Sequence, residues 1–367
     1  MPVITASRIV TGEGGVSPSP AWVVTDGERI VAVGTGAPPH GEELIDATDS
    51  LLAPGAIDIQ INGTGGTDFA HAPVDELVTA VESIAAAGCP SVLPTLVSAP
   101  LDAYASMLER VAAARERVPA ILGVHLEGPF LGDARGAHPA ELLRPVELEW
   151  LLALCDGFAD LIRIVTLAPE ADPGLRATRA LSERGIVVAL GHSTASYAEA
   201  TAAADAGARL VTHLFNGMGP LHHREPGLPG AALDDRRLVP SFIADLVHVH
   251  PAALRTALVV RPDSVLVTDR VGGQLYVRDG AARLPDGTLA GSVIGMWDSV
   301  RNLVTHGVPL GTAVRTATGN PARLLGLDRG RVAPGARADL VALDPETLSP
   351  VAVWRAGAAP DSRARPR

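Results

Sequence analysis

The sequence predicts an α/β protein built on a (β/α)8 TIM-type barrel, with a small β-sandwich domain formed by the two ends of the chain. Two observations lead to the barrel. Short apolar runs, which are typical of buried parallel strands, alternate with helix-like segments over residues 54–329. Four of these runs end at a metal-binding or acid–base residue, and catalytic residues gather at the carboxyl ends of barrel strands.

Eight runs between residues 54 and 329 have the length and composition of barrel strands, and helical patterns separate them. The expected strands are Ala56–Ile61, Ser91–Thr95, Ile121–His125, Leu161–Thr166, Ile186–Leu190, Arg209–His213, Ser241–Ala244 and Val265–Thr268. The expected helices are Val74–Ala87, Leu101–Arg117, Glu147–Cys155, Gly174–Arg184, Ser196–Ala206, Pro251–Leu258 and Ser299–His306.

The two ends of the chain have a different sequence pattern, in which short β-rich runs alternate with Gly and Pro. Neither end is long enough to bury a core alone, so residues 1–53 and 330–367 are predicted to form one β-sandwich together. The expected strands are Ile4–Val10, Ala21–Thr25, Arg29–Val33, Ala338–Leu343 and Pro350–Arg355. Residues 54–329 are then the catalytic barrel.

The composition excludes several classes of function. The net charge of −11 argues against a nucleic-acid surface and suits a soluble metabolic enzyme. All 30 basic residues are arginine, so neither a Schiff-base lysine nor a carbamylated lysine bridging two metals is possible. A metal site must therefore use His, carboxylate and neutral oxygen ligands.

Nothing in the sequence points to export or to a membrane. No apolar stretch has the roughly 18–20 residues that span a bilayer, and the first residues lack the pattern of a signal peptide. Cys89 and Cys155 are too few for a disulfide framework and are expected to be buried, reduced thiols. We expect a cytoplasmic protein with no membrane partner.

Three of the residues at strand ends have the chemistry of a metal site. Glu127 follows the third expected strand, where the alternative is a glutamate paired with a buried arginine. His192 and His213 lie one helix-and-strand unit apart and so belong to adjacent strands. Imidazole and carboxylate are ordinary ligands of zinc or iron, and three protein ligands leave a position for water.

Asp269 follows the eighth expected strand, where a carboxylate can take a proton from water and deliver it to a leaving amine. The alternative is an aspartate that only forms hydrogen bonds at a strand end. Further along the site, Asn216 and Gly217 offer donors beside His213, and Arg224 is suited to an anion such as phosphate. His248 is predicted to face a ligand, whereas His250, before a proline, is predicted to begin a helix.

Seven segments, in order along nearly the whole chain, resemble the N-acetylglucosamine-6-phosphate deacetylases, which are metal-dependent amidohydrolases. They are Pro54–Gly63, His125–Phe130, Gly136–Pro139, Gly191–Ser193, Thr212–Met218, Arg224–Gly227 and Val267–Asp269.

The resemblance implies a role for each of these residues. Glu127, His192 and His213 would hold one divalent metal, zinc or iron, with Gln60 beside it and Asp269 as base and then acid. The residues implied in binding the substrate are His138 at the acetamido group or the sugar, Asn216, Gly217, Arg224 and His248 at the sugar phosphate, and, without an assigned contact, Ala137, Ile294, Gly295 and Met296. Arg224 would reach from a neighbouring subunit, which implies a homodimer.

The segment Gln60-Ile61-Asn62 stands where many amidohydrolases carry His-x-His for a second metal, so one metal is expected. Other departures lie near Asp269. Arg270 follows it, and an arginine there would lower the pKa of Asp269. The loop that follows is about a dozen residues shorter than in the family, which would open the site or change its pocket. Leu246 replaces the glycine of an Asp-Gly pair.

The leading hypothesis is hydrolysis of N-acetylglucosamine 6-phosphate to glucosamine 6-phosphate and acetate. A second hypothesis keeps the metal chemistry but changes the substrate to another N-acyl sugar or an acyl amino acid. A third is a degenerate paralogue that binds a sugar phosphate without turnover.

Overall fold

The computed structural model describes residues 1–40, 43–273 and 276–358. Within it, eight strands form one sheet in the order β14-β13-β12-β11-β10-β9-β8-β5, so that neighbours along the chain are neighbours in the sheet. These strands are β5 (Ile57–Ile61), β8 (Ser91–Leu96), β9 (Val124–Glu127), β10 (Ile162–Leu167), β11 (Val187–Leu190), β12 (Leu210–Val211), β13 (Val239–Ile243) and β14 (Val265–Val267). The predicted (β/α)8 barrel is confirmed, and each of its eight strands lies where the sequence placed it.

The two ends of this sheet meet just beyond the last residues of β14. The backbone N–H of Asp269 donates to the carbonyl of Gln60 at 2.9 Å, and the N–H of Asn62 donates to the carbonyl of Arg270 at 2.8 Å. These bonds join the segment after β14 to β5 and nearly close the barrel. They also bring Asp269 beside two residues that lie more than 200 positions away in the sequence.

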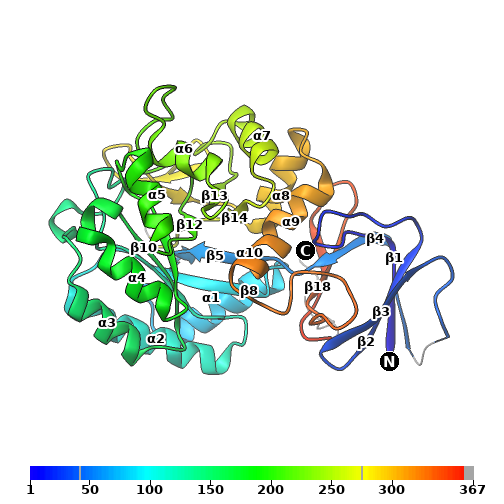
Figure 1. Ribbon diagram of the computed structural model, residues 1–367. Coiled ribbons are helices and arrows are strands. Elements are labelled where there is room, and N and C mark those ends of the chain that lie inside the picture. Colours follow the sequence, from blue (N-terminus) through cyan, green and yellow to red (C-terminus); the bar gives the residue numbers. More distant parts are fainter. Residues whose placement is uncertain (41–42, 274–275, 359–367) are drawn as a thin grey trace. The chain divides into compact units, whose positions relative to one another are not determined.

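Helices follow the barrel strands, and Figure 1 shows α2 to α5 on the outside of the strands. Their sequences explain their positions. Helix α2 buries Tyr104, Met107, Leu108, Val111 and Ala114, which repeat at three- and four-residue spacing on one face. The helices of this part of the chain are α1 (Val74–Ala86), α2 (Tyr104–Arg117), α3 (Leu148–Gly157), α4 (Arg176–Glu183), α5 (Tyr197–Asp205), α6 (Gly227–Asp234) and α7 (Pro251–Val260). Shorter elements are β6 (Gly63–Thr64), β7 (Thr67–Asp68), η1 (Leu101–Ala103), η2 (Ala140–Leu142), η3 (Pro169–Ala171) and η4 (Pro173–Leu175).

Helix α6 was not predicted, because it contains Gly227, Pro229 and Gly230, residues that helix propensity disfavours. Burial explains why it forms, because its residues Leu228, Ala231 and Ala232 are all buried. At Gly230 a Cβ would lie 2.2 Å from the Cβ of Pro226 at the start of the same helix, so only glycine fits there. The ends of the other predicted helices differ from the observed ends by a few residues. The helix expected over Leu101–Arg117 begins with the separate turn η1.

Three short antiparallel strands follow Asp269, namely β15 (Tyr276–Arg278), β16 (Ala281–Arg283) and β17 (Leu289–Ser292), in the order β15-β16-β17. The sequence also predicts a strand over Gln274–Arg278, of which positions 274 and 275 lie outside the described residues. The short loop after Asp269 therefore leads into a small sheet.

Strands from both ends of the chain join in one six-stranded sheet, in the order β19-β18-β4-β1-β2-β3, as the sequence predicted. They are β1 (Pro2–Ile9), β2 (Ala21–Asp26), β3 (Arg29–Thr35), β4 (Glu43–Pro54), β18 (Leu340–Leu343) and β19 (Pro350–Trp354). The long strand β4, which sequence reasoning missed because charged residues interrupt it, pairs with β1 on one side and β18 on the other.

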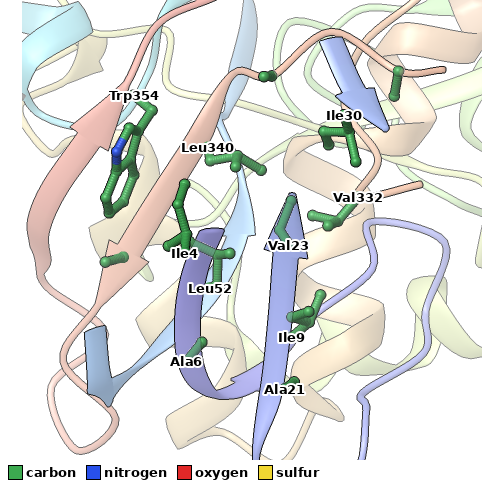
Figure 2. Packing of buried hydrophobic residues seen from close by; sticks show 13 residues of the cluster. Ile4, Ala6, Ile9, Ala21, Val23, Ile30, Leu52, Val332, Leu340 and Trp354 are labelled. Carbon is green, nitrogen blue, oxygen red and sulfur yellow. The ribbon is translucent and has the colours of Figure 1, made fainter. Parts of the chain in front are cut away.

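One apolar cluster covers a face of this sheet (Figure 2). Ile4, Val23 and Leu52 come from its first strands, whereas Leu340 and Trp354 come from the other end of the chain, and each is at most 2% exposed. Because each fully buried aliphatic side chain stabilises the fold by roughly 1.5–3 kcal/mol, neither end would be stable without the other.

The chain divides into two compact units. We call Ile59–Val81 with Val92–Ile294 the barrel unit, and the described residues of Met1–Asp58, Glu82–Ser91 and Gly295–Arg367 the terminal unit. The terminal unit also holds α8 (Met296–Thr305), α9 (Leu310–Ala317) and α10 (Gly319–Leu324). The domain boundaries at 53/54 and 329/330 stay a prediction, and residues 359–367 of that prediction lie outside the described residues.

Two further findings bear on the sequence predictions. Cys89 and Cys155 are buried and form no disulfide. Among the described residues, no helix combines the length and the apolar character needed to cross a bilayer.

Arg261, which follows α7, is a fully buried cation that ties the end of α6 to the segment after α7. Its guanidinium donates to the carbonyls of Ala232 and Asp235 and holds both carboxylate oxygens of Asp263, at 3.0 and 2.8 Å. Replacing Arg261 with methionine leaves these acceptors without their donors, so we expect the free energy of unfolding to fall by about 3 kcal/mol.

Urea unfolding of Arg261→Met measures this loss, and Arg236→Met is the matched control. Arg236 reaches the same Asp263 at 3.9 Å, but its side chain is 68% exposed. An exposed pair contributes little, so the control should change stability by less than about 0.5 kcal/mol. Equal losses in the two variants would contradict the role assigned to Arg261.

Candidate metal centre and active site

Glu127, His192 and His213 meet at the carboxyl ends of three barrel strands. Glu127 is the last residue of β9, and the two histidines follow β11 and β12, which are adjacent in the sheet. The Nε2 atoms of both histidines lie 3.1 Å from Oε1 of Glu127 and 3.1 Å from each other. All three residues are buried. The structure thus brings together the three metal ligands that the sequence predicted.

This triangle has the size that a tetrahedral metal site requires. Ligand atoms at about 2.0–2.1 Å from a tetrahedral cation lie about 3.3–3.4 Å apart, close to the 3.1 Å observed. One carboxylate and two imidazoles are also a usual ligand set for a divalent transition metal. The cluster therefore fits a divalent metal ion in both size and chemistry.

The backbone fixes which nitrogen of each histidine faces the cluster. Nδ1 of His192 lies 3.2 Å from the carbonyl of Ala134, and Nδ1 of His213 lies 3.1 Å from the carbonyl of Asn216. A carbonyl only accepts, so Nδ1 donates and Nε2 keeps its lone pair for a metal.

Glu127 is held in the form that binds a cation. Burial raises the pKa of its carboxyl, but the contacts with the imidazoles of His192 and His213 outweigh burial and keep this pKa well below its usual range. In the described structure the carboxylate of Glu127 accepts a hydrogen bond from Gln60 and contacts Nε2 of these two histidines. Glu127 therefore does not form the pair with a buried arginine that was the alternative from the sequence.

Asp269 follows β14 and is joined to β5 by two amide side chains. Nδ2 of Asn62 donates to Oδ1 of Asp269 at 2.8 Å, and Nε2 of Gln60 lies 3.4 Å from the same oxygen. Gln60 also donates to Glu127 at 3.0 Å. Gln60 thus lies between the expected base and a metal ligand, where the sequence predicted a residue beside the metal.

The expectation that Arg270 lowers the pKa of Asp269 is wrong. Burial and the negative charge of Glu127 raise this pKa to about 6, and His213, His248 and the Asn62 hydrogen bond offset only part of the rise. A carboxyl with a pKa near neutrality can exchange protons with substrate and water, as acid–base catalysis requires.

Three of these residues adopt a backbone conformation that L-amino acids rarely adopt. The φ angle is +49° at His192, +33° at His213 and +46° at Asp269. Non-glycine residues in this left-handed region each cost roughly 1–3 kcal/mol and occur preferentially at functional sites. All three residues line the same cavity.

A cavity of about 710 Å³ opens above the cluster, which is within the range of small-molecule sites. Its lining includes Glu127, His192, His213 and Asp269 together with five of the residues expected to bind substrate, namely Ala137, His138, Asn216, Gly217 and His248. All the lining residues belong to the barrel unit.

Two of the lining histidines are oriented by neighbours. Nδ1 of His138 lies 2.8 Å from Oγ of Ser98, and burial lowers the pKa of His138 to about 3, so its ring is neutral. Nδ1 of His248 lies 2.7 Å from Oδ2 of Asp245, a contact that fixes the ring. Leu246, in the position of the missing glycine, has φ +68° and takes the conformation that glycine would take. His250 caps α7, as predicted.

The other predicted substrate residues do not line this cavity. Arg224 is exposed, in a loop where Leu221 to Glu225 are all exposed, and its Nη1 lies 2.8 Å from His223. Ile294 lies between β17 and α8, whereas Gly295 and Met296 belong to the terminal unit, where they begin α8. Their roles in binding stay predictions.

Sequence reasoning missed several residues that line the cavity, among them Arg283 and Asn62. Arg283 of β16 is the one arginine among the described lining residues, and its Nη1 donates to the carbonyl of Gly287 at 2.9 Å. Residues 287–291 of the same small sheet form a further part of the wall. The second is Asn62, whose position in Gln60-Ile61-Asn62 was the only signal. The loop after Asp269 is thus short, but the sheet that follows it supplies a wall of the pocket.

Comparison with known proteins assigns the chain to a family of metal-dependent hydrolases. The sequence model of the amidohydrolase family matches residues 51–361. The N-acetylgalactosamine-6-phosphate deacetylase of Escherichia coli O157:H7 is 37% identical, with 93% of this chain and 95% of that protein covered. The human N-acetylglucosamine-6-phosphate deacetylase is 39% identical, with 87% of each chain covered.

Among solved structures, the N-acetyl-D-glucosamine-6-phosphate deacetylase of Mycobacterium smegmatis is similar over almost the whole chain. A mutant of that protein, solved in complex with N-acetyl-D-glucosamine-6-phosphate, superposes with a TM-score of 0.91 at 38% identity, covering 97% of this chain and 98% of that one. The N-acetylglucosamine-6-phosphate deacetylase of Pasteurella multocida gives a TM-score of 0.90 at 32% identity, covering 97% and 98%.

Proposed function

We infer the function from the premise that this chain belongs to the amidohydrolase family, and within it to the deacetylases of N-acetylated hexosamine 6-phosphates. We propose that it hydrolyses the acetamide of N-acetylglucosamine 6-phosphate, giving glucosamine 6-phosphate and acetate. The observation that supports this reaction most strongly is the cluster of Glu127, His192 and His213, which shares one cavity with Asp269.

The metal is proposed to be one zinc ion per subunit, with iron as the alternative. Two imidazoles and one carboxylate in a tetrahedral arrangement suit zinc, and three protein ligands leave a position open. A second metal would need ligands at the end of β5. The two polar residues there, Gln60 and Asn62, are amides whose N–H groups donate to Glu127 and Asp269, so these groups do not act as metal ligands. When bound, the cation would supply Lewis-acid polarisation of the amide carbonyl and would acidify water.

The residues of the chain carry the rest of the reaction. Asp269 takes the proton of the attacking water and then gives it to the departing nitrogen, for which a pKa near neutrality is suited. His138 is neutral, and its Nδ1 is occupied by Ser98, so its other nitrogen is left for the acetamido group. Asn216 and Gly217 line the same cavity and are proposed to bind the sugar phosphate.

The decisive experiment is an acetate-release assay. Protein stripped of metal and reloaded with zinc or iron is mixed with N-acetylglucosamine 6-phosphate at millimolar concentration. Stoichiometric release of acetate and a free amino sugar is expected. If the metal-loaded protein binds this substrate tightly but releases no acetate, it is a sugar-phosphate-binding paralogue instead.

The phosphate is proposed to lie near His248, with cationic partners from two sources. Arg283 lines the cavity of its own chain. Arg224 does not, and we propose that its exposed loop reaches the cavity of a second subunit in a homodimer. Both Arg224→Ala and Arg283→Ala are then expected to lower kcat/KM for the phosphorylated substrate by about 10–100-fold, because each removes a charge-assisted hydrogen bond.

Kinetics with N-acetylglucosamine, which has no phosphate, provide the comparison. Loss of a phosphate contact should leave kcat/KM for this sugar nearly unchanged in both variants. Arg179→Ala is a suitable control, because Arg179 is an exposed arginine of α4 whose guanidinium donates to the carbonyls of Gly174 and Leu175 in its own segment. A parallel fall for both substrates would show that neither arginine recognises phosphate.

The pH dependence of the reaction follows from the pKa of Asp269. A general base acts only when it is ionised, so kcat/KM is expected to fall as pH drops through this pKa. The value is about 6 from burial and Glu127, and a bound cation stabilises the carboxylate and lowers it further. The acid limb should therefore lie at about pH 6 or below, and a midpoint clearly above it would contradict Asp269 as the base.

The galactosamine epimer is a second candidate substrate, because an N-acetylgalactosamine-6-phosphate deacetylase is among the most similar relatives. The two sugars differ only in the orientation of one hydroxyl group, so the same metal chemistry serves both. Measurement of kcat/KM for both epimers separates the two functions. If neither epimer is turned over, the substrate is another N-acyl sugar or an acyl amino acid.

We also propose a cytoplasmic location, which fits two buried cysteines that form no disulfide.

A further inference from the structure

The turn that carries His192 is strained, and neighbouring loops hold it in place. The φ angle of +49° at His192 is one that non-glycine residues adopt only where the surrounding structure imposes it. The carbonyl of His192 accepts the backbone N–H of Gly132 at 2.8 Å, and the N–H of Ser193 donates to the carbonyl of Gly217 at 3.0 Å. The groups that hold this turn therefore also position the imidazole of His192.

Glu170, in η3 after β10, holds the two residues that follow His192. Its Oε2 accepts the hydroxyl of Ser193 at 2.6 Å, and its Oε1 accepts the backbone N–H of Thr194 at 2.8 Å. Oγ of Ser193 in turn accepts the N–H of Ala195 at 3.0 Å. Ser193 is fully buried, so water does not replace Glu170 as the acceptor of its hydroxyl.

The loop after β9 packs closely against both Glu170 and the turn. A Cβ on Gly132 would lie 2.2 Å from Oε1 of Glu170 and 3.1 Å from the carbonyl oxygen of His192. Glycine at this position lets the loop approach the carboxylate and the turn together. The segments after β9, β10 and β11, three adjacent strands, are thus joined at the carboxyl end of the barrel.

Glu170 can influence the metal centre only through this turn. It is not among the described residues that line the cavity, and its two hydrogen bonds go to the chain just beyond His192. The imidazole of His192 is held at Nδ1 by the carbonyl of Ala134 at 3.2 Å, which leaves Nε2 3.1 Å from Oε1 of Glu127. A shift of the turn would move Nε2 out of this arrangement.

We propose that Glu170 is a positioning residue for the metal centre. By holding Ser193 and Thr194, it keeps the strained turn closed and Nε2 of His192 at the cluster before the metal arrives. A ligand held in its binding geometry loses less conformational freedom when the metal binds, so the metal binds more tightly. The inference rests on the proposed metal centre. Glu170 itself binds neither metal nor substrate.

The affinity for zinc measures this role without reference to turnover. The full-length protein is stripped of metal, and the zinc Kd is determined by competition with a chromophoric chelator. Glu170→Ala should raise this Kd about 10–100-fold, the range found when a residue that orients a metal ligand is removed. Acetate release at limiting zinc should fall accordingly. Excess zinc should restore kcat, with KM for the substrate unchanged, because no group that contacts the substrate is lost.

Two further variants separate the hydrogen bonds of Glu170 from its charge. In Glu170→Gln, the amide oxygen can accept from Thr194 and the amide nitrogen can donate to Oγ of Ser193, so most of the zinc affinity should be retained. Ser193→Ala removes one of the two hydrogen bonds and should raise the zinc Kd less than Glu170→Ala does. It also tests the inference if Glu170→Ala does not fold.

Glu199→Ala is the matched control. Like Glu170, Glu199 is an exposed glutamate whose carboxylate accepts one hydroxyl and one backbone N–H, both from Ser196 and both at 2.8 Å. These bonds close the capping box at the start of α5 and do not reach the turn at His192. Glu199→Ala should lower the melting temperature slightly and leave the zinc Kd unchanged.

The outcomes distinguish the inference from the proposed function. An unchanged zinc Kd in Glu170→Ala would overturn the inference. Equal losses in Glu170→Gln and Glu170→Ala would also overturn it, because the charge of Glu170 and not its hydrogen bonds would then set the affinity. Wild-type protein that binds neither zinc nor iron would instead overturn the proposed metal centre, and the inference with it.

Discussion

Replacing Asp269 with asparagine is expected to lower kcat at least about 10³-fold, since general acid–base catalysis contributes roughly 10²–10⁴-fold and this one residue serves both steps. The substitution changes little else. An asparagine oxygen can still accept the hydrogen bonds that Asn62 and Gln60 now donate to Oδ1. The side chain keeps its shape and loses only its ability to carry a proton.

Single-turnover acetate release measures the effect, and metal analysis accompanies it. Metal content and melting temperature should match the wild type, because Glu127, His192 and His213 remain in place. Asp279→Asn, at an exposed turn in the small sheet after Asp269, is the control and should keep full activity. Activity of Asp269→Asn close to that of the wild type would refute Asp269 as the base.

Removing the metal is expected to abolish turnover and to destabilise the protein. A ligand present at a thousandfold excess over its Kd stabilises the folded state by about 4 kcal/mol, which corresponds to roughly 5–10 °C in melting temperature. Glu127→Gln should have the same consequences without a chelator. The amide it introduces is neutral and directs either a donor or a weaker acceptor at the cluster.

Calorimetry with and without chelator, and metal analysis of the variant, test this expectation. Readdition of zinc should restore both activity and melting temperature in the wild type but not in Glu127→Gln. Glu147→Gln is the matched control, because Glu147 is an exposed glutamate paired with Arg144 and should bind metal normally when changed. A melting temperature that does not respond to metal would contradict the site.

The parts of the site that sequence reasoning found share one physical property. Glu127, His192, His213 and Asp269 each end an apolar run, and in a parallel barrel the ends of all strands meet at one mouth. The one-unit spacing of His192 and His213 then implies adjacent strands, and β11 and β12 do pair. Strand periodicity alone therefore brings these four side chains together.

The parts that were missed depend on interactions that no periodicity encodes. Arg283 lines the cavity because a small antiparallel sheet forms after Asp269, in a segment without a barrel-like pattern. The sign of the Asp269 pKa shift was wrong for a related reason. A neighbour in sequence, Arg270, had less influence than burial and the charge of Glu127, which lies far away along the chain. Helix α6 likewise forms despite its helix-breaking residues, because its side chains are buried.

The left-handed backbone at His192, His213 and Asp269 sets the stability of the fold against its chemistry at these positions. Glycine, which adopts this conformation freely, would relieve the strain at each of them. Each position therefore gives up backbone stability for a side chain that the chemistry requires, which is the trade-off between stability and activity expected at a functional site.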